Sequence, residues 1–246
     1  MNDSSHADEI LDWPDAGVKA AFEMLAGATG DIVRMIDVGA HRGETLLAMD
    51  RLLDGPACYI GLEPNPPTYA QLSESAKACS DSMSATLLQA AAGPEPGEVE
   101  FKATQASAVA GVLEAVDGLN DRVPRGDHKI VESVTVEMTT VDTVLAEAKL
   151  DAVDLLKIDS EGFDLQVLLG AADTLSHHTA AAVMCEVFFV PYRNGQAFFW
   201  DIAKFMEEKG YHFVNLYDGR NTSQGRLYTA NALWLSPSLA AHNDFL

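Results

Sequence analysis

The chain has 246 residues, of which 48% are hydrophobic and 22% are charged, as in an ordinary globular protein. Acidic residues outnumber basic ones by 37 to 16, and the net charge of −21 argues against DNA or RNA as a partner, because it repels a phosphate backbone. No apolar run reaches the roughly 18 residues of a membrane span, and the polar, acidic first residues are unlike a signal peptide. We therefore expect a cytoplasmic protein that binds a small neutral or cationic molecule and contacts neither membrane nor nucleic acid. A homo-oligomer is compatible with this sequence.

The first half of the chain alternates apolar runs with helical patterns. Residues 1–30 are expected to form a tail and a short helix, in which Val18, Phe22 and Leu25 share one face. Strands are then predicted at 32–38, 57–63 and about 85–90, with helices at about 42–53 and 68–79. Successive β-α units of this kind predict a parallel sheet with right-handed crossovers.

The alternation stops after the third strand. A turn cluster at 93–97 precedes a short strand at 98–102, and the pattern is weak from there to about residue 129. A loop of this length within a compact domain is usually a lid, a binding loop or a disordered segment. We therefore predict a lid or insertion at residues 103–130, with an unstructured surface loop as the alternative. Its polar candidates for acceptor binding are Arg122, Arg125 and His128.

The second half returns to the alternating pattern. Strands are predicted at 131–138, 152–159, 180–186, 211–217 and 227–235, and helices at about 140–149, 163–172 and 196–208. Because only a turn separates the last two strands, they are most simply antiparallel. The predicted fold class is α/β, with a mostly parallel sheet, an antiparallel C-terminal edge and helices on both faces. One domain is expected at 31–236, followed by a C-terminal tail at 237–246.

Acidic side chains gather at the expected ends of the strands, where open parallel sheets bind their ligands. Four of the five residues at these ends are acids, which solubility alone explains poorly: Asp37, Glu63, Gln89, Asp159 and Glu186. Glu63 lies 20 residues after Gly43, where a carboxylate can bind the two hydroxyls of an adenosine ribose. This placement serves NAD and S-adenosylmethionine equally.

The glycine turn after the first strand distinguishes these two ligands. A dinucleotide site needs G-x-G-x-x-G, so that the diphosphate can approach the helix N-terminus. Residues 39–43 read G-A-H-R-G, without the second glycine, and Asp37 precedes them. A carboxylate there suits a ligand with an ammonium group, which favours S-adenosylmethionine over NAD.

The most specific stretch is the strand end and turn at residues 154–164. Lys157 and Asp159 share one face of an otherwise apolar strand. Because a buried lysine is costly unless it is paired, we expect an ion pair between Lys157 and either Asp159 or Glu161. Gly162 would permit the turn into the next helix. An ion pair with a purely structural role is the alternative.

Three motifs follow one another along the chain: D-V-G-A-H-R-G-E-T at residues 37–45, E-P-N-P at 63–66 and K-I-D-S-E-G at 157–162. In this order they resemble the FkbM-type S-adenosylmethionine-dependent methyltransferases, and the stretches at 89–93 and 140–145 also fit. The resemblance covers roughly residues 32–190 and departs at His41, where the family usually has asparagine. It implies a class I methyltransferase (Rossmann-like) fold with a seven-stranded sheet. It also implies methylation of hydroxyl oxygens on sugars, polyketides or other natural products.

The resemblance implies a role for each motif residue. The methionine end of the cofactor would be held by Asp37, Gly39, Ala40, His41, Gly43 and Thr45. Glu63 would hold the ribose. The adenine would lie among Pro64, Asn65, Gln89 and Ala90. Asp159 would sit beside the methyl group and the acceptor.

Methyl transfer to a hydroxyl requires groups that align the acceptor and remove its proton. Asp159 is the first candidate for the base, with Glu161 and Glu186 behind it. Alternatively, Asp159 and Glu186 could share a magnesium ion that lowers the pKa of the hydroxyl, although nothing in the spacing requires a metal. A NAD-dependent oxidoreductase and a binding protein that has lost activity would share the fold. The missing glycine argues against the first, and the retained motifs argue against the second.

The positions of two further groups of residues are predicted from the elements that precede them in the chain. The mouth of the site is expected to include Tyr192, Arg193 and Asn194, which follow the strand predicted at 180–186. The aromatic cluster of Phe198, Phe199 and Trp200 is expected to pack in the core.

Overall fold

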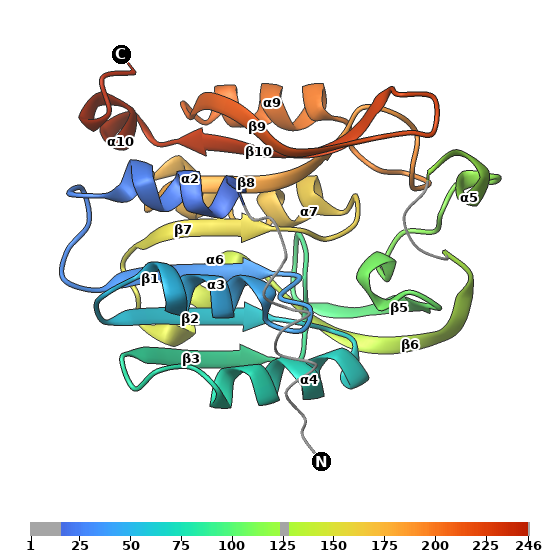
Figure 1. Cartoon of the computed structure of the whole chain (residues 1–246), viewed down its shortest axis with the longest axis horizontal. Helices are drawn as coiled ribbons and strands as arrows, with labels where there is room; N and C mark the ends of the chain where they lie inside the picture. Colours follow the sequence, from blue (N-terminus) through green and yellow to red (C-terminus); the bar gives the residue numbers. More distant parts are fainter. Residues whose placement is uncertain (1–15, 124–127, 246) are drawn as a thin grey trace.

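The computed structural model describes residues 16–123 and 128–245, and a mostly parallel sheet forms its centre (Figure 1). The strands of this sheet are β1 (Val33–Val38), β2 (Ala57–Leu62), β3 (Met83–Leu88), β7 (Val153–Ile158), β8 (Ala180–Phe188), β9 (His212–Asn221) and β10 (Leu227–Leu235). Within the described residues these seven strands lie in the order β3-β2-β1-β7-β8-β10-β9. The first five are mutually parallel, whereas β10 is antiparallel to both β8 and β9. The predicted fold class is confirmed, and its antiparallel strand is β10, inserted before the edge strand β9.

The chain changes direction across the sheet between β1 and β7. Strands β2 and β3 are added on one side of β1, and β7 then pairs with the other side. Ligands of open α/β sheets bind at such a switch point, outside the carboxyl ends of the strands. The register places Asp37 of β1 beside Lys157 of β7. Two residues that are 120 positions apart in the chain therefore meet where a ligand would bind.

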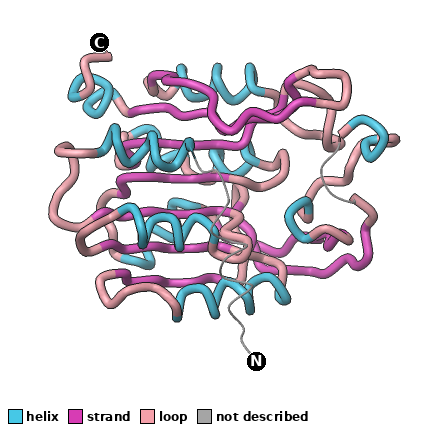
Figure 2. The backbone as a smooth tube through the Cα atoms, viewed as in Figure 1, coloured by secondary structure: helices cyan, strands magenta, loops and turns pink. Residues whose placement is uncertain are grey.

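Helices cover both faces of the sheet, as Figure 2 shows. One face carries α2 (Ala16–Leu25), α3 (Glu44–Leu52), α4 (Pro66–Lys77) and α10 (Pro237–His242). The other face carries α6 (Val141–Ala148), α7 (Asp164–Leu169), α8 (Ala172–Ser176) and α9 (Phe199–Glu208). Among the described helices, none combines the length and the apolar character that a membrane crossing demands.

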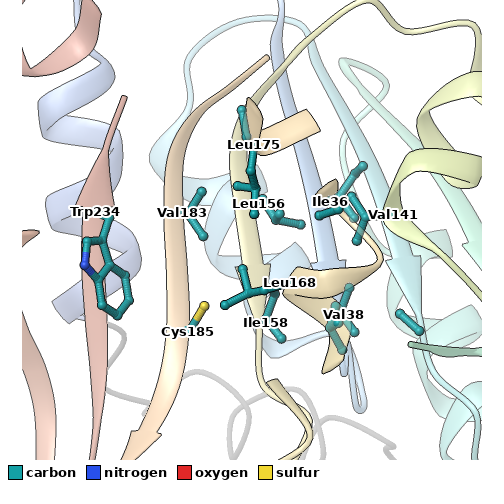
Figure 3. Packing of buried hydrophobic residues seen from close by; sticks show 14 of the residues in the cluster. Ile36, Val38, Val141, Leu156, Ile158, Leu168, Leu175, Val183, Cys185 and Trp234 are labelled. Atoms are coloured by element: carbon teal, nitrogen blue, oxygen red, sulfur yellow. The ribbon is translucent and has the colours of Figure 1, made fainter. Parts of the chain in front are cut away.

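The inner strands are apolar on both faces because helices cover both faces. In β7, Leu155 belongs to one core cluster and Leu156 to the other, since successive residues of a strand point to opposite faces. Figure 3 shows the second cluster, in which Ile36, Leu156 and Val183 of three neighbouring strands lie with Leu168 of α7. Complete burial of one such side chain contributes about 1.5–3 kcal/mol.

Two segments differ most from the predicted boundaries. The helix predicted at 163–172 is divided into α7 and α8 at Gly170, where the backbone of Gly93 approaches closely. A Cβ on Gly170 would lie 2.0 Å from the Gly93 oxygen. The segment expected to be a C-terminal tail contains α10, which begins with a Ser236 cap and buries Leu239 against the core.

The aromatic cluster is divided between core and surface. Phe199 packs in the core, with its ring centroid 5.3 Å from that of Phe189 and 6.5 Å from that of Trp234. Trp200 is 55% exposed and stacks on Phe198. The prediction of core packing is therefore wrong for Trp200, which lies on the outer side of α9.

Residues 91–139 contain a second, smaller sheet and the segment predicted as a lid or insertion. In the described structure this sheet has the strand order β4-β6-β5, formed by β4 (Ala91–Ala92), β5 (Gly97–Thr104) and β6 (Ile130–Thr139). The connection from β5 to β6 includes a 3-10 helix, η1 (Ser107–Val109), and the short helix α5 (Leu119–Arg122). We call residues 105–116 the cap segment. Backbone hydrogen bonds from Val116 to Tyr192 and from Asn194 to Glu114 join it to the loop after β8.

Two adjacent leucines of α7 test this core. Leu168 is fully buried, whereas Leu169 is 42% exposed. Because a truncated core leucine loses both its transfer free energy and its packing contacts, Leu168→Ala should lower the free energy of unfolding by about 2–5 kcal/mol. Leu169→Ala, the matched control, should lower it by less than about 1 kcal/mol. Urea denaturation measures both, and similar losses would contradict the orientation of α7.

Candidate functional site

A cleft opens at the carboxyl ends of the strands, beside the switch point between β1 and β7. Its volume is about 1180 Å³ with the open mouth included. The glycine turn, the ends of β2, β7 and β8, the cap segment and the β9–β10 hairpin form its walls. The predicted site residues that line it are Gly39, Ala40, His41, Thr45, Glu63, Pro64, Ala90, Asp159, Glu161 and Glu186. Residues from three motifs that are distant in the chain thus meet in one place.

Four other predicted site residues do not line the cleft. Gln89 is exposed, and Gly43 begins α3. Asn65 is buried at the start of α4, where its side chain donates to the Thr68 hydroxyl. Asp37 is fully buried behind the cleft wall. We propose that Asp37, Gly43 and Asn65 support a ligand through the strand end, turn and helix start that they shape.

Lys157 and Asp37 form a buried ion pair at the base of the cleft. The Lys157 Nζ lies 3.1 Å from Asp37 Oδ1, and the Tyr59 hydroxyl donates to Asp37 Oδ2 at 2.7 Å. Asp159 Oδ2 is more distant, 4.0 Å from the same ammonium. The predicted pair of Lys157 with Asp159 is therefore present as the longer of the two contacts, and Glu161 pairs with Arg193. The nearest carboxylate is that of Asp37, on the neighbouring strand β1. It could not be found from the residues around Lys157 in the sequence.

The glycine turn lies tightly between β7 and α4. Gly39 has a φ of 79°, and a Cβ on it would lie 1.9 Å from the Asp159 backbone oxygen. Glycine alone meets both conditions without strain. Gly43 has a φ of 92°, and a Cβ there would lie 2.9 Å from the Ser75 Cβ. The two glycines are therefore required by the packing of the turn as well as by its path.

His41 lies between the two glycines and contacts three neighbours. Its backbone N–H donates to Glu63 Oε2 at 3.0 Å. Its ring Nδ1 lies 2.9 Å from Glu44 Oε1, and its ring Nε2 lies 3.0 Å from Ser107 Oγ. Sequence reasoning missed both ring partners. Glu44 resembles an ordinary acid in the first turn of a helix, and Ser107 belongs to a segment without a periodic pattern.

Glu63 follows β2 directly and lines the cleft although the residue is only 5% exposed. Its two carboxylate oxygens accept hydrogen bonds from the backbone N–H groups of His41, at 3.0 Å, and Asn65, at 2.9 Å. Burial raises the pKa of Glu63 to about 7, although these N–H donors oppose the rise. Each oxygen retains a lone pair, so that the ionised carboxylate can accept two more hydrogen bonds from a ligand.

Asp159, Glu161 and Glu186 bring three carboxylates together on another side of the cleft. One oxygen of each lies within 4.8 Å of the others. The Asp159 side chain is 37% exposed. Glu161 is buried and accepts from the Arg193 guanidinium at 2.7 Å, and Glu186 is buried and accepts from the Thr229 hydroxyl at 3.1 Å. Carboxylates so placed can take up a proton, and they are also ligands that magnesium prefers.

Asp164, the first residue of α7, is a buried acid for which the sequence predicts no role. Its Oδ2 accepts from the Ser160 hydroxyl at 3.1 Å and from the Gly162 N–H at 3.2 Å. Burial, and after it the nearby Asp159, raise the pKa of Asp164 to about 8. These bonds hold a turn in which Glu161 has a φ of 54°, unusual for a residue with a side chain. Asp164 thereby supports the turn that carries the acid cluster.

Five residues of the cap segment, most of them small, close one side of the cleft. They are Ser107, Ala108, Ala110, Gly111 and Val112. Of the polar candidates predicted in this region, His128 is buried edge-on against the Tyr192 ring and does not line the cleft. The Arg122 side chain and Arg125 lie outside the described residues.

The loop after β8 anchors the cap segment. The Arg193 guanidinium is buried and donates both to the Val109 carbonyl and to Glu161. The Asn194 N–H donates to the Glu114 carbonyl. The predicted mouth residues Tyr192, Arg193 and Asn194 therefore contact the cap segment and do not line the cleft. Instead the β9–β10 hairpin lines it, through Asp218, Arg220, Thr229, Ala230 and Asn231.

The Lys157–Asp37 pair should be essential to stability. Lys157→Met leaves Asp37 in a fully buried position without its cation, and we expect a loss of about 3–5 kcal/mol in the free energy of unfolding. Adding Asp37→Asn should restore part of this loss, because the remaining charge is removed. Lys204→Met is the matched control. Its side chain is 76% exposed, and it should cost less than about 1 kcal/mol.

Chemical denaturation of the single and double variants measures this coupling. Strictly additive losses for Lys157→Met and Asp37→Asn would contradict the pairing.

A family model of the methyltransferase FkbM domain matches residues 37–213 of the chain. Among curated proteins, none matches the sequence. The match begins at Asp37, includes the glycine turn, Glu63 and the acid cluster, and ends in β9.

Solved structures agree with this assignment at the level of fold. Methyltransferase FkbM from Methylobacillus flagellatus KT has a TM-score of 0.53 and 18% identity, with coverage of 85% of this chain and 45% of that chain. The METTL16 methyltransferase domain has a TM-score of 0.50 and 10% identity, with coverage of 89% and 66%. The chain thus spans less than half of the Methylobacillus protein. Because the family model covers well over half of this chain, the protein belongs to the FkbM methyltransferase family.

Proposed function

We propose that the protein is an S-adenosylmethionine-dependent methyltransferase that methylates a hydroxyl oxygen of a small molecule, such as a sugar or another natural product. The observation that carries this proposal is the convergence of Glu63, the glycine turn and Asp159 on one cleft. Glu63 offers a carboxylate to a ribose, and the turn offers a close backbone approach. Asp159 offers an accessible carboxylate for an acceptor hydroxyl. Membership of the FkbM family supports the same activity.

The charge of the cleft suits S-adenosylmethionine better than a dinucleotide. Its acidic lining residues are Glu44, Glu63, Asp159, Glu161, Glu186 and Asp218. Apart from His41, its basic lining residues are Lys157 and Arg220. This negative excess attracts a ligand with a sulfonium and an ammonium group, and it repels a diphosphate. The lining therefore argues against a NAD-dependent oxidoreductase.

S-adenosylmethionine, when bound, supplies an electrophilic methyl group. The chain has to align the acceptor hydroxyl and take up its proton. We assign removal of the hydroxyl proton to Asp159, since it is the most accessible of the three clustered acids. Lys157, whose Nζ lies 4.0 Å from Asp159 Oδ2, orients this carboxylate. Glu161 and Glu186 are bonded to Arg193 and Thr229, and we assign them to shaping the acceptor side of the cleft. A magnesium ion shared with Asp159 stays the less favoured route, because nothing in the spacing of these acids requires a metal.

Binding of S-adenosylhomocysteine should strengthen as Glu63 ionises. The pKa of about 7 is raised by burial, so without ligand the carboxyl is mostly protonated at pH 6 and mostly ionised at pH 8. Only the ionised form offers both oxygens to the ribose hydroxyls, so the affinity should rise by about tenfold over this range. Calorimetric titration measures it. Glu63→Gln should bind more weakly at pH 8 and lose most of the pH dependence.

His41 and Glu44 are the other titratable groups that face this carboxylate. Because Glu63→Gln leaves both in place, any pH dependence that remains in this variant belongs to them and not to Glu63. NAD serves as the control ligand and should not bind. A wild-type affinity that does not depend on pH, or tighter binding of NAD than of S-adenosylhomocysteine, would contradict the ribose assignment.

Asp159→Asn tests the proposed base. The amide keeps the shape of the side chain but cannot take up a proton, so turnover should fall by at least about a hundredfold. The affinity for S-adenosylhomocysteine should change by less than about threefold. Transfer of a labelled methyl group to a panel of sugars and natural products measures turnover. Asp151→Asn, at an exposed acid just before β7, is the control.

Near-normal turnover by Asp159→Asn would exclude this residue as the base. A wild-type rate that EDTA abolishes would favour the magnesium route. If the wild type binds S-adenosylhomocysteine but transfers no methyl group, the binding-protein alternative is favoured.

A further inference from the structure

His41 connects three parts of the cleft. Its backbone N–H donates to Glu63 at the end of β2, its ring Nδ1 faces Glu44 in the first turn of α3, and its ring Nε2 faces Ser107 in the cap segment. The ring lines the cleft, with 22% of the side chain exposed. One residue thus contacts both the proposed ribose carboxylate and the segment that closes the other side.

A chain of hydrogen bonds fixes the ring. The Arg42 guanidinium donates to Ser107 Oγ at 3.2 Å, and His41 Nε2 lies 3.0 Å from the same oxygen. On the other side of the ring, Nδ1 lies 2.9 Å from Glu44 Oε1. Although burial alone would raise it, hydrogen bonds from His41 and from backbone N–H groups hold the pKa of Glu44 below its usual value. The ionised Glu44 carboxylate therefore completes the chain as its final acceptor.

The backbone conformation does not explain why this position is a histidine. Its φ of 49° is as open to asparagine as to histidine. Asparagine, however, is too short to present polar atoms to Glu44 and Ser107 together, because these partners lie at the two separate nitrogens of the ring. The histidine is therefore explained by its two ring contacts.

Within the cap segment, the chain passes from Ser107, which contacts His41, to Gly111, which lies near the acid cluster. Gly111 of this segment lies against the turn after β7, where a Cβ on Gly111 would come within 3.2 Å of the Glu161 Cβ. Five residues of the segment line the cleft. A shift of Ser107 would therefore change the space beside Glu161, on the acceptor side.

We propose that His41 is a positioning residue that couples cofactor binding to the placement of the cap segment over the acceptor side of the cleft. This inference rests on the proposed function. A ribose bound by Glu63 fixes that carboxylate, which holds the His41 N–H and the turn around it. The ring, directed by Glu44, then holds Ser107. The cap segment is placed for the acceptor once the cofactor is bound.

Hydrogen exchange with and without S-adenosylhomocysteine tests the coupling. In the wild type, the ligand should slow exchange of the amides in residues 105–112 by at least about threefold more than in α9, a helix with no residue that lines the cleft. His41→Asn removes the ring but keeps the backbone N–H, and Ser107→Ala removes the hydroxyl. At a saturating concentration of S-adenosylhomocysteine, each variant should lose most of this slowing. The double variant should lose no more of the ligand-induced slowing than either single variant, because both substitutions remove the same contact between His41 and Ser107.

His242→Asn is the matched control, since His242 is an exposed histidine on α10. Both test variants keep the second anchor of the cap segment, the bond from Arg193 to the Val109 carbonyl. A purely structural role for His41 would change exchange equally with and without ligand.

Slowing that persists in His41→Asn and Ser107→Ala would overturn the inference. So would a wild-type cap segment that does not respond although the ligand binds. If the wild type fails to bind S-adenosylhomocysteine, the proposed function is overturned and this inference with it, so the two failures are distinguishable.

Discussion

The buried ion pair between Lys157 and Asp37 is the constraint on which the rest of the site depends. It joins β7 to β1 where the chain changes direction across the sheet, with side chains that are 8% and 0% exposed. A charge in such a place is stable only while its partner is present, so the pair holds the two strands in one register. That register places Gly39 against the Asp159 carbonyl. The glycine turn and the acid cluster therefore share one support.

Three carboxylates show how differently one group can be used within a single cleft. Asp37 is fully buried, and its oxygens accept from Lys157 and Tyr59. Glu63 accepts hydrogen bonds from the backbone N–H groups of His41 and Asn65, and burial raises its pKa to about 7, so that a ligand can draw it into the ionised form. Asp159 is the accessible one and faces the acceptor side. Burial and hydrogen bonding thus suit chemically similar side chains to different tasks: support by Asp37, and the proposed cofactor binding by Glu63 and proton transfer by Asp159.

The sequence predicts the fold and the convergence of its three motifs on one cleft, for a physical reason. In a parallel sheet the carboxyl ends of the strands meet at one edge, so Glu63 and Asp159 could be placed in one cleft from the order of the elements alone. The nearest partner of Lys157 could not be found, because it depends on the register of two strands far apart in the chain. The bonding partners of Ser107 and Arg193 could not be predicted, for another reason, although Arg193 itself was expected at the mouth of the site. Their contacts depend on how a segment without periodicity packs onto the sheet.

A crystal structure with S-adenosylhomocysteine tests the central claim most directly. The account predicts that the ribose hydroxyls lie within hydrogen-bond distance of both Glu63 oxygens, that the methionine end lies along the turn from Gly39 to His41, and that the sulfur faces Asp159. A ligand bound outside this cleft, or one whose ribose lies on a different carboxylate, would contradict it.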